Sequence, residues 1–285
     1  MPKITVIITT YNRANLVKDA IKSVLSQSFQ DFELIVVDDC SPDNTEEAVK
    51  IFQDKRIFYL RHKENKGDAA AKNTGIRAAK GEYIITLDDD DLMAPWALAE
   101  LFKKFCNYAN KNIGGVYGWS WWVYNEGKTL KFLTFQKKGR IFEAVFKNQV
   151  FTNILLKKEI FDIIGYYDES LYSNYDYDFY LRLAKVYEID FVPRILFVIR
   201  VQRQKHLSSL SRPHLERTQS VRQRYSKNAW NPKMLMFKFC PISFYLKLSL
   251  LKHKIATALK IIINAQLRQE PKKIREELSK QGIKI

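Results

Sequence analysis

The alternation of strand-like and helix-like segments in the first hundred residues constrains the fold of this chain most strongly. Four runs rich in Val, Ile, Phe and Tyr lie at residues 4–10, 32–38, 56–61 and 82–88. Between them, apolar residues recur at the spacing of a helix that buries one face. Near-continuous apolar strands alternating with helices are typical of a largely parallel sheet. The sequence therefore predicts an α/β fold with a mostly parallel central sheet and helices on both faces.

The residues that follow three of these runs are polar and mostly acidic. The runs lead into "TTYNR" at 9–13, "DDCSPDN" at 38–44 and "DDDD" at 88–91. Ligands in open α/β sheets bind beyond the carboxyl ends of the strands, so we expect these segments to meet at a binding rim. A Rossmann site for NAD or FAD needs G-x-G-x-x-G after the first strand, and "TTYNR" contains no glycine.

Four adjacent carboxylates, Asp88 to Asp91, repel one another unless a cation lies among them. Mg²⁺ and Mn²⁺ prefer oxygen ligands and share them with phosphate groups. The cluster therefore favours a site for a divalent metal and a phosphate-bearing ligand. An exposed acidic loop without a ligand is the alternative interpretation.

Three further features have both a functional and a structural interpretation. Tyr11 fits either stacking on a nucleobase or packing at the rim. Asp176 and Asp178 lie at the amino end of a predicted helix over 176–187, where carboxylates act as caps or, at the rim, as a general base. The histidine His206 fits either an ordinary surface position or a contact with a metal or phosphate.

The positive charge of the chain is confined to its last third. The full sequence has 47 Lys and Arg against 31 Asp and Glu, a net charge of +16. Residues 193–285 hold 21 basic and 4 acidic residues, whereas residues 1–192 are nearly neutral. This asymmetry predicts an anionic partner for the tail. Residues 241–285 place apolar side chains at helical spacing among lysines, so we expect a basic helical extension on an anionic membrane surface. A helix docked on the preceding domain is the alternative.

The expected location is cytoplasmic, peripheral at the inner face of the cell membrane. The chain opens without the apolar core and cleavage site of a secretory signal, and no run reaches about 18 apolar residues. The three widely separated cysteines are typical of free thiols in a reducing compartment.

Taken together, these stretches resemble the family-2 glycosyltransferases of the GT-A fold over roughly residues 3–210. The matching segments, in the family's order and spacing, are "ITVIITTYNR", "FELIVVDDCSPDNT", "NKGDAAAKNTGIRAAKGEYIITLDDDDLMAP", "GYYDESL" and "DYDFYLRLAK". The resemblance implies a catalytic domain over 1–210, with a nucleotide-sugar half at 1–110 and an acceptor half at 111–210. Residues 211–285 would then form the basic, mainly helical extension.

The resemblance also implies a role for each donor-site residue. Thr9, Tyr11 and Asp39 match positions that hold the nucleoside, and Lys72 matches a basic residue near the nucleotide. Asp88 and Asp89 are expected at the ribose and the diphosphate.

Two further roles concern the metal and the acceptor. Asp90 is expected to bind Mn²⁺ or Mg²⁺, with Asp88 as the other outer residue of the family's D-x-D signature and His206 as a loosely matching ligand. Asp176 matches the catalytic base, although Tyr175 precedes it where the family has glutamate, and Asp178 is the competing candidate for the base.

The activity implied by the resemblance is inverting transfer of a sugar from a nucleotide-diphospho-sugar, with UDP expected. The acceptor would be a hydroxyl of a glycan or lipid-linked saccharide, in the synthesis of a cell-surface polysaccharide or glycoconjugate. A sugar-nucleotide nucleotidyltransferase would need a glycine-rich phosphate loop that "TTYNRAN" lacks. A non-enzymatic nucleic-acid-binding protein would not need the acidic rim, so no nucleic-acid partner is expected.

Overall fold

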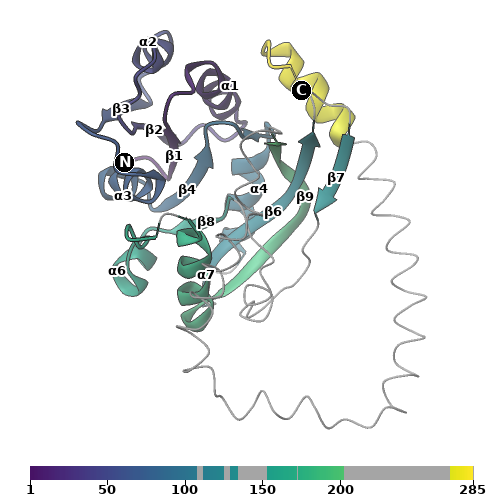
Figure 1. The fold of residues 1–285 in the computed structure, drawn as a ribbon. Coiled ribbons are helices and arrows are strands. Elements are labelled where there is room, and N and C mark those ends of the chain that lie inside the picture. Colours follow the sequence, from purple (N-terminus) through teal and green to yellow (C-terminus); the bar gives the residue numbers. More distant parts are fainter. Residues whose placement is uncertain (108–111, 125–128, 134–152, 172, 202–269, 285) are drawn as a thin grey trace.

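The computed structural model describes six stretches of the chain, at residues 1–107, 112–124, 129–133, 153–171, 173–201 and 270–284. Within them, nine strands form one sheet in the order β3-β2-β1-β4-β8-β6-β9-β5, with β7 paired to β6 outside this order (Figure 1). The strands are β1 (Ile4–Thr10), β2 (Phe32–Asp38), β3 (Ile57–Arg61), β4 (Tyr83–Asp88), β5 (Leu92–Met93), β6 (Ile113–Tyr124), β7 (Thr129–Leu133), β8 (Leu155–Lys157) and β9 (Glu188–Val201). The helices are α1 (Ala14–Leu25), α2 (Thr45–Lys50), α3 (Asp68–Ala78), α4 (Ala97–Cys106), α6 (Ile160–Ile164) and α7 (Tyr175–Val186).

The amino-terminal half of the sheet is parallel, as the sequence predicts. Strand β1 pairs in parallel with β2 and β4, and β2 pairs in parallel with β3. Every residue of β1 and β2 is buried, because helices cover both faces. Alternate strand residues point to opposite faces, so Val6 packs with the cluster of α1, α2 and α4, whereas Ile7 packs with that of α3, α6 and α7.

The carboxyl-terminal half of the sheet is mixed. Strand β8 is antiparallel to both β4 and β6, and β7 extends β6 as an antiparallel partner. The long strands β6 and β9 run in parallel, and β5 returns antiparallel to β9. The short strand β5 therefore joins the acidic segment that follows β4 to the far half of the sheet.

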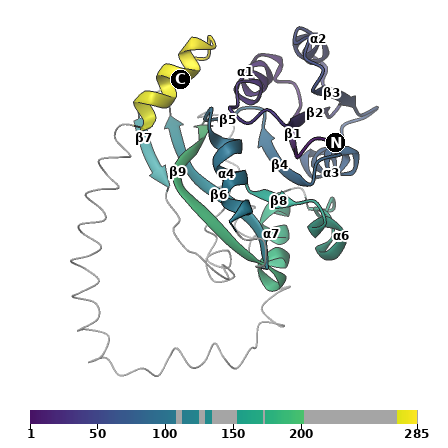
Figure 2. The same ribbon diagram turned by 180° about the vertical axis from the view of Figure 1, so that it is seen from behind.

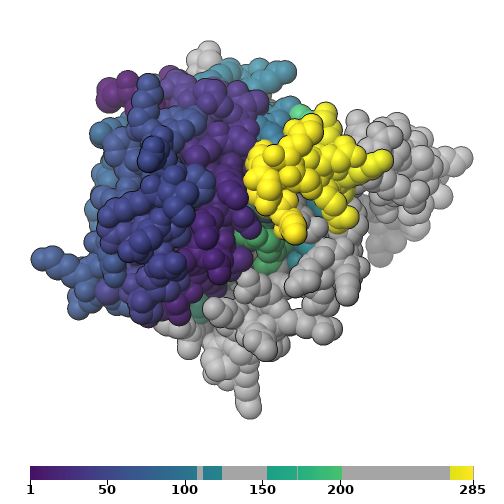
Figure 3. All heavy atoms as spheres, turned by 90° about the horizontal axis from the view of Figure 1, so that it is seen from above, coloured from purple at the N-terminus to yellow at the C-terminus, as the bar shows by residue number. Residues whose placement is uncertain are grey.

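The last described segment docks on this sheet. Residues 270–280 form a helix, and Ile274, Leu278 and Ile283 are fully buried in a cluster with Trp121 of β6 and Leu92 of β5. Figures 1 and 2 show the helix beside the start of β7 and the carboxyl end of β6, and Figure 3 shows it as part of the outer surface of the molecule.

This docking corrects part of the membrane prediction. For residues 270–284 the expected membrane-facing surface is wrong, because their apolar side chains are buried on the protein's own sheet. The remainder of the 241–285 segment lies outside the described residues. Among the residues that are described, no helix has both the length and the apolar character needed to cross a bilayer.

Candidate active site

The acidic segment lies where the sequence predicts, at the carboxyl rim of the parallel strands. Strand β4 ends at Asp88, and β5 begins at Leu92, so Asp89 to Asp91 form a link of three residues between two strands of the sheet. The parallel register sets Thr9 of β1 beside Asp88. The three polar segments that follow β1, β2 and β4 therefore meet at one rim.

Arg13, just before α1, contacts this link. Its Nη1 atom lies 2.7 Å from Asp89 Oδ1 and 3.1 Å from Asp90 Oδ2. The Thr10 hydroxyl donates a hydrogen bond to the other oxygen of Asp89 at 2.8 Å. Burial raises the pKa of the Asp89 carboxyl to about 6, against the lowering effect of the Arg13 guanidinium. A cation thus already lies against two of the four rim aspartates.

The four rim aspartates differ in their exposure. The Asp88 side chain is 53% exposed, whereas Asp89, Asp90 and Asp91 are almost fully buried. Burial, together with repulsion from Asp90 and Asp88, raises the pKa of Asp91 well above its ordinary value. Asp88 is therefore the rim carboxylate that opens to solvent.

The rim fits a divalent cation by its chemistry, because buried, mutually repelling carboxylates attract a cation. Across the described part of the chain, no three His, Cys, Asp or Glu side chains converge as a ready-made metal cage. Mg²⁺ and Mn²⁺ commonly take one or two protein carboxylates and complete their shell with water and phosphate oxygens. Asp90 and Asp88 would supply such carboxylates, whereas His206 lies outside the described residues.

Lys72 of α3 lies behind Asp88. Its Nζ donates to Asp68 at 2.7 Å, to Asp88 at 2.9 Å and to the Tyr175 hydroxyl at 3.0 Å, and these bonds engage all three of its protons. Burial alone would lower the pKa of Lys72, but the Asp68 and Asp88 carboxylates outweigh it and hold the pKa well above its ordinary value. Lys72 therefore holds the Asp88 carboxylate from the buried side of the rim. The contact with a nucleotide that the resemblance implies for Lys72 stays a prediction.

Asp68, the first residue of α3, is hydrogen-bonded to residues of both β1 and α7. It accepts a hydrogen bond from Thr9 Oγ1 at 2.6 Å and another from the Tyr175 hydroxyl. Thr9 is 6% exposed, so its side chain supports α3 from beneath, whereas Tyr11 is 46% exposed at the rim. Of the two, Tyr11 is the residue with a side chain open to a ligand.

Asp39, at the end of β2, organises the loop that leads into α3. Its carboxylate accepts hydrogen bonds from the backbone amides of Lys66 and Gly67, both at 2.8 Å, and lies 2.7 Å from His62 Nδ1. The other ring nitrogen of His62 lies 2.9 Å from Thr74 Oγ1. Gly67 has a φ of +88°, which favours glycine, so this loop has a defined shape. The nucleoside contact expected of Asp39 stays a prediction.

The first turn of α7 carries both candidates for the general base. Burial raises the pKa of the Asp176 carboxyl, opposed by a hydrogen bond from the Tyr177 amide and by the charge of Lys72. Asp178 is 4% exposed and is bonded at 2.9 Å to Arg182, which donates to the carbonyl of the last residue of α6 and to those of the two residues that follow it. Asp176 is thus coupled to the charges of the rim, whereas Asp178 anchors α7 to its neighbouring loop.

Comparison with known proteins decides the family. Residues 5–165, more than half of the chain, match the model described as glycosyl transferase family 2. The chain is 32% identical to an uncharacterized glycosyltransferase of Methanocaldococcus jannaschii, over 75% of this chain and 76% of that protein.

The chain belongs to glycosyltransferase family 2. Over a shorter stretch of 121 residues, this glycosyltransferase is 41% identical to a Campylobacter jejuni protein. That protein is named GalNAc(5)-diNAcBac-PP-undecaprenol beta-1,3-glucosyltransferase, and the match covers 41% of this chain and 38% of that protein.

Solved structures share the fold of this glycosyltransferase. Staphylococcus aureus TarS in complex with UDP-GlcNAc has a TM-score of 0.59 and 22% identity, with 73% of this chain and 61% of that chain covered. The mannosyltransferase PcManGT of Pyrobaculum calidifontis, in complex with GDP-Man and Mn²⁺, has a TM-score of 0.55 and 18% identity, with 94% and 87% covered. The predicted GT-A architecture is confirmed.

Sequence reasoning missed four residues that shape the site, namely Arg13, His62, Asp68 and Arg200. Arg200 of β9 donates to the carbonyl of Asp90 at 2.5 Å and pairs with Asp19 of α1 at 2.9 Å. Arg13, His62 and Arg200 meet their partners only in the folded chain, whereas Asp68 also pairs with Lys72, four residues along the same helix. Two sequence signals were present: Arg13 follows directly on "TTYN" at the predicted rim, and Asp68 lies four residues before Lys72, the spacing of an ion pair on a helix.

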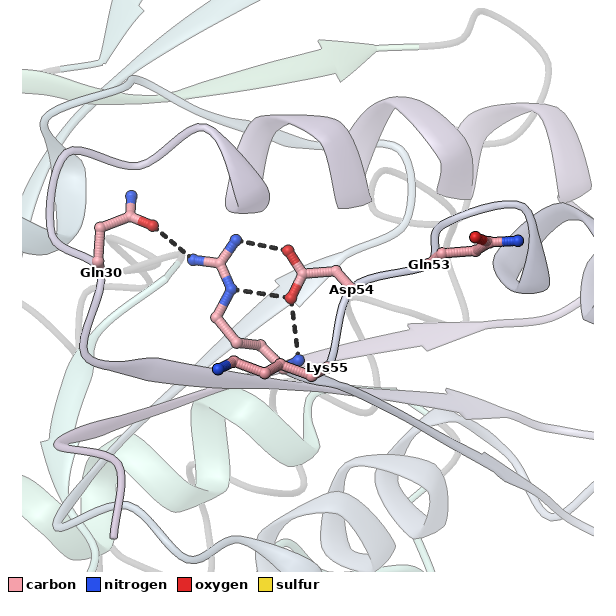
Figure 4. Close-up of a pocket in the computed structure, with 5 residues that line it drawn as sticks. Gln30, Gln53, Asp54 and Lys55 are labelled. Carbon is pink, nitrogen blue, oxygen red and sulfur yellow. Dashed lines mark hydrogen bonds and ion pairs between the residues drawn. The ribbon is translucent and has the colours of Figure 1, made fainter.

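A depression in the surface of the glycosyltransferase, drawn in Figure 4, lies away from this rim. It is lined by Gln30, Gln53, Asp54, Lys55 and Arg56, which precede the amino ends of β2 and β3. The Arg56 guanidinium forms two hydrogen bonds with Asp54, at 2.6 and 3.0 Å, and one with Gln30 at 2.7 Å, and the Arg56 amide donates to Asp54 at 2.9 Å. These groups satisfy one another, and the depression lies at the opposite ends of the strands from the acidic rim.

Proposed function

We propose that this glycosyltransferase transfers a sugar from a UDP-sugar to a hydroxyl of a glycan or lipid-linked saccharide, with inversion at the anomeric carbon and with Mn²⁺ or Mg²⁺. The observation that carries the proposal is the hydrogen-bonded network of Lys72, Asp68 and Tyr175. It joins the exposed carboxylate Asp88 to the helix that bears Asp176. Donor and acceptor chemistry would thus meet at one rim.

Three named proteins support the choice of ligands. TarS is described with UDP-GlcNAc, PcManGT with GDP-Man and Mn²⁺, and the Campylobacter relative acts on an undecaprenol-linked saccharide according to its name. A uridine nucleotide fits the rim if Tyr11 stacks on the base and Asp39 accepts a hydrogen bond from it. These contacts would leave the diphosphate at Asp88 and Asp90.

The reaction would divide between two sides of the bound sugar. A divalent ion held by Asp90 and Asp88 would neutralise the diphosphate as it leaves. On the acceptor side, Asp176 would take the proton of the attacking hydroxyl, and its raised pKa makes it a stronger base than an ordinary aspartate. Attack opposite the leaving group inverts the anomeric centre without a covalent intermediate.

Donor binding is tested first, because it needs no acceptor. UDP with Mn²⁺ should raise the melting temperature of the wild-type protein, and Asp90→Ala should remove this shift. GDP under the same conditions tests the choice of nucleotide. A wild-type protein that no nucleoside diphosphate stabilises in the presence of Mn²⁺ would contradict the donor site.

The base is tested by a matched pair on α7. Nucleotide release from the accepted donor should be lost in Asp176→Asn, while stabilisation by UDP and Mn²⁺ is retained. Asp178→Asn, two residues along the same helix, should keep nucleotide release. Normal turnover by Asp176→Asn would refute its assignment as the base.

We also propose a peripheral location at the inner face of the cell membrane. Its support is the charge of residues 193–285, with 21 basic against 4 acidic residues. Sedimentation with vesicles containing phosphatidylglycerol should carry the protein down, and phosphatidylcholine vesicles should not. Equal recovery with both vesicles would count against this location.

A further inference from the structure

One guanidinium lies at the place where the acidic rim would receive a metal. Arg13 Nη1 contacts both Asp89, at 2.7 Å, and Asp90, at 3.1 Å. The side chains of the two aspartates are 3% and 7% exposed, so little water is available to screen their negative charges. We propose that Arg13 is the resident counter-ion of the rim, and that a divalent metal replaces it only when the metal arrives together with a nucleoside diphosphate.

The first step of the argument is electrostatic. A metal bound to the Asp90 carboxylate would lie beside the Arg13 guanidinium if Arg13 stayed in place, because Arg13 contacts the same carboxylate. Two positive charges this close repel each other strongly where little water screens them, and a divalent ion doubles the repulsion of a single charge. Free metal must therefore displace Arg13 from Asp90, and the guanidinium then loses one of its two carboxylate partners.

The second step is that a diphosphate removes this cost. A nucleoside diphosphate brings negative oxygens into the space beside the metal, and guanidinium groups bind such oxygens through two parallel hydrogen bonds. Arg13 could then exchange carboxylates for phosphate while the metal takes the carboxylates. Metal and diphosphate would each strengthen the binding of the other.

The third step is that Arg13 can move without unfolding the rim. The amide of Ala14, the first residue of α1, is bonded to Asp43 at 3.0 Å, and the Arg13 side chain makes no cap of its own. Asp89 keeps its bond from Thr10, and the Asp90 carbonyl keeps its bond from Arg200. The Arg13 side chain is 27% exposed, which leaves it room to swing toward a ligand.

The inference rests on the proposed function, and the test separates the two. Binding of Mn²⁺ is measured by electron paramagnetic resonance of the free ion, without nucleotide and with saturating UDP. In the wild type, UDP should tighten Mn²⁺ binding by about tenfold or more. If UDP does not tighten it, the proposed donor site fails, whatever the variants do.

Arg13→Gln removes the charge. We expect it to bind Mn²⁺ alone about tenfold more tightly than the wild type does, and the gain from UDP should shrink by a similar factor. Arg13→Lys retains a cation and should behave like the wild type, while Arg77→Gln, at a 56% exposed arginine, controls for the loss of charge elsewhere. Should Arg13→Gln not fold, Arg13→Met gives the same comparison. Unchanged binding of Mn²⁺ alone in the uncharged variants, with normal UDP coupling in the wild type, would overturn the proposal.

Discussion

The ammonium group of Lys72 lies 2.9 Å from the carboxylate of Asp88. The lysine is 6% exposed, whereas the aspartate side chain is 53% exposed, so the pair spans the boundary between the core and the rim. A buried cation thus fixes the carboxylate that is most accessible to a ligand. The same ammonium contacts Asp68 and Tyr175, and this arrangement makes the rim one connected unit.

Replacing Lys72 by methionine should destabilise the protein. The change leaves Asp68 and Asp88 without their shared donor, at a cost of about 2 kcal/mol after allowance for the partial exposure of both partners. Urea denaturation measures the difference. Lys63→Met, at an exposed lysine, is the matched control and should stay within about 0.5 kcal/mol of the wild type. Equal stability of the two variants would show that the network adds little.

Tyr175→Phe removes one hydroxyl from the network. Since this hydroxyl donates to Asp68 and accepts from Lys72, its loss should lower the free energy of unfolding by about 1 kcal/mol. Tyr175 directly precedes Asp176 on α7, so if Asp176 is the base, turnover should fall in this variant. The rise in melting temperature caused by UDP and Mn²⁺ should be kept. Tyr166→Phe, whose ring packs against Phe161, controls for loss of a hydroxyl elsewhere. A parallel loss of nucleotide binding would show that Tyr175 serves the donor side instead.

Asp178→Asn should affect stability more than activity. The carboxylate holds Arg182, which in turn binds three carbonyls at the carboxyl end of α6 and just beyond it. Weakening this anchor should cost about 2 kcal/mol of unfolding free energy. Denaturation and nucleotide release measured on one preparation separate the two effects. Complete loss of turnover in a folded variant would reopen the choice between Asp178 and Asp176.

The buried face of the last helix should be required for the stability of the sheet. Ile274→Ala removes methyl groups from a fully buried site and should cost about 3 kcal/mol. Glu276→Ala, on the exposed side of the same helix, should have little effect. Thermal unfolding followed by circular dichroism compares the two. A neutral Ile274→Ala would mean that the helix contributes little binding energy to the fold.

The pH dependence of stability should carry a signature of Asp89. Its pKa is raised from an ordinary value of 3.8 to about 6, so between these values the folded protein binds more protons than the unfolded chain. This contribution to stability is fully present below pH 3.8 and is lost as the pH rises through about 6. Relative to Asp89→Asn, the wild type should lose about 3 kcal/mol over that interval. Urea titrations in EDTA check this, and a constant difference between the two proteins would contradict it.

Much of the fold was predictable because it depends on local patterns. The apolar runs at 4–10 and 32–38 coincide with β1 and β2, since both strands are buried on both faces and form near-continuous apolar segments. The meeting of three polar segments at one rim follows from parallel pairing alone.

Most partners within the site were not predictable, because they depend on contacts between distant segments. Arg13 meets Asp89 across 76 residues, and no spacing rule connects them. The docking of the helix at 270–280 also could not be predicted from the sequence. A basic amphipathic helix fits a membrane or a protein surface equally well by pattern, and only its packing on β5 and β6 distinguishes the two.

The link between β4 and β5 also limits how this protein can be altered. Asp88 is held beside Thr9 by the pairing of β4, and Leu92 is held beside Val198 by the pairing of β5. One inserted residue would turn Leu92, which is fully buried, toward the opposite face of the sheet. Libraries built to change metal or donor preference should therefore vary the side chains at 89–91 and leave the length of the link unchanged.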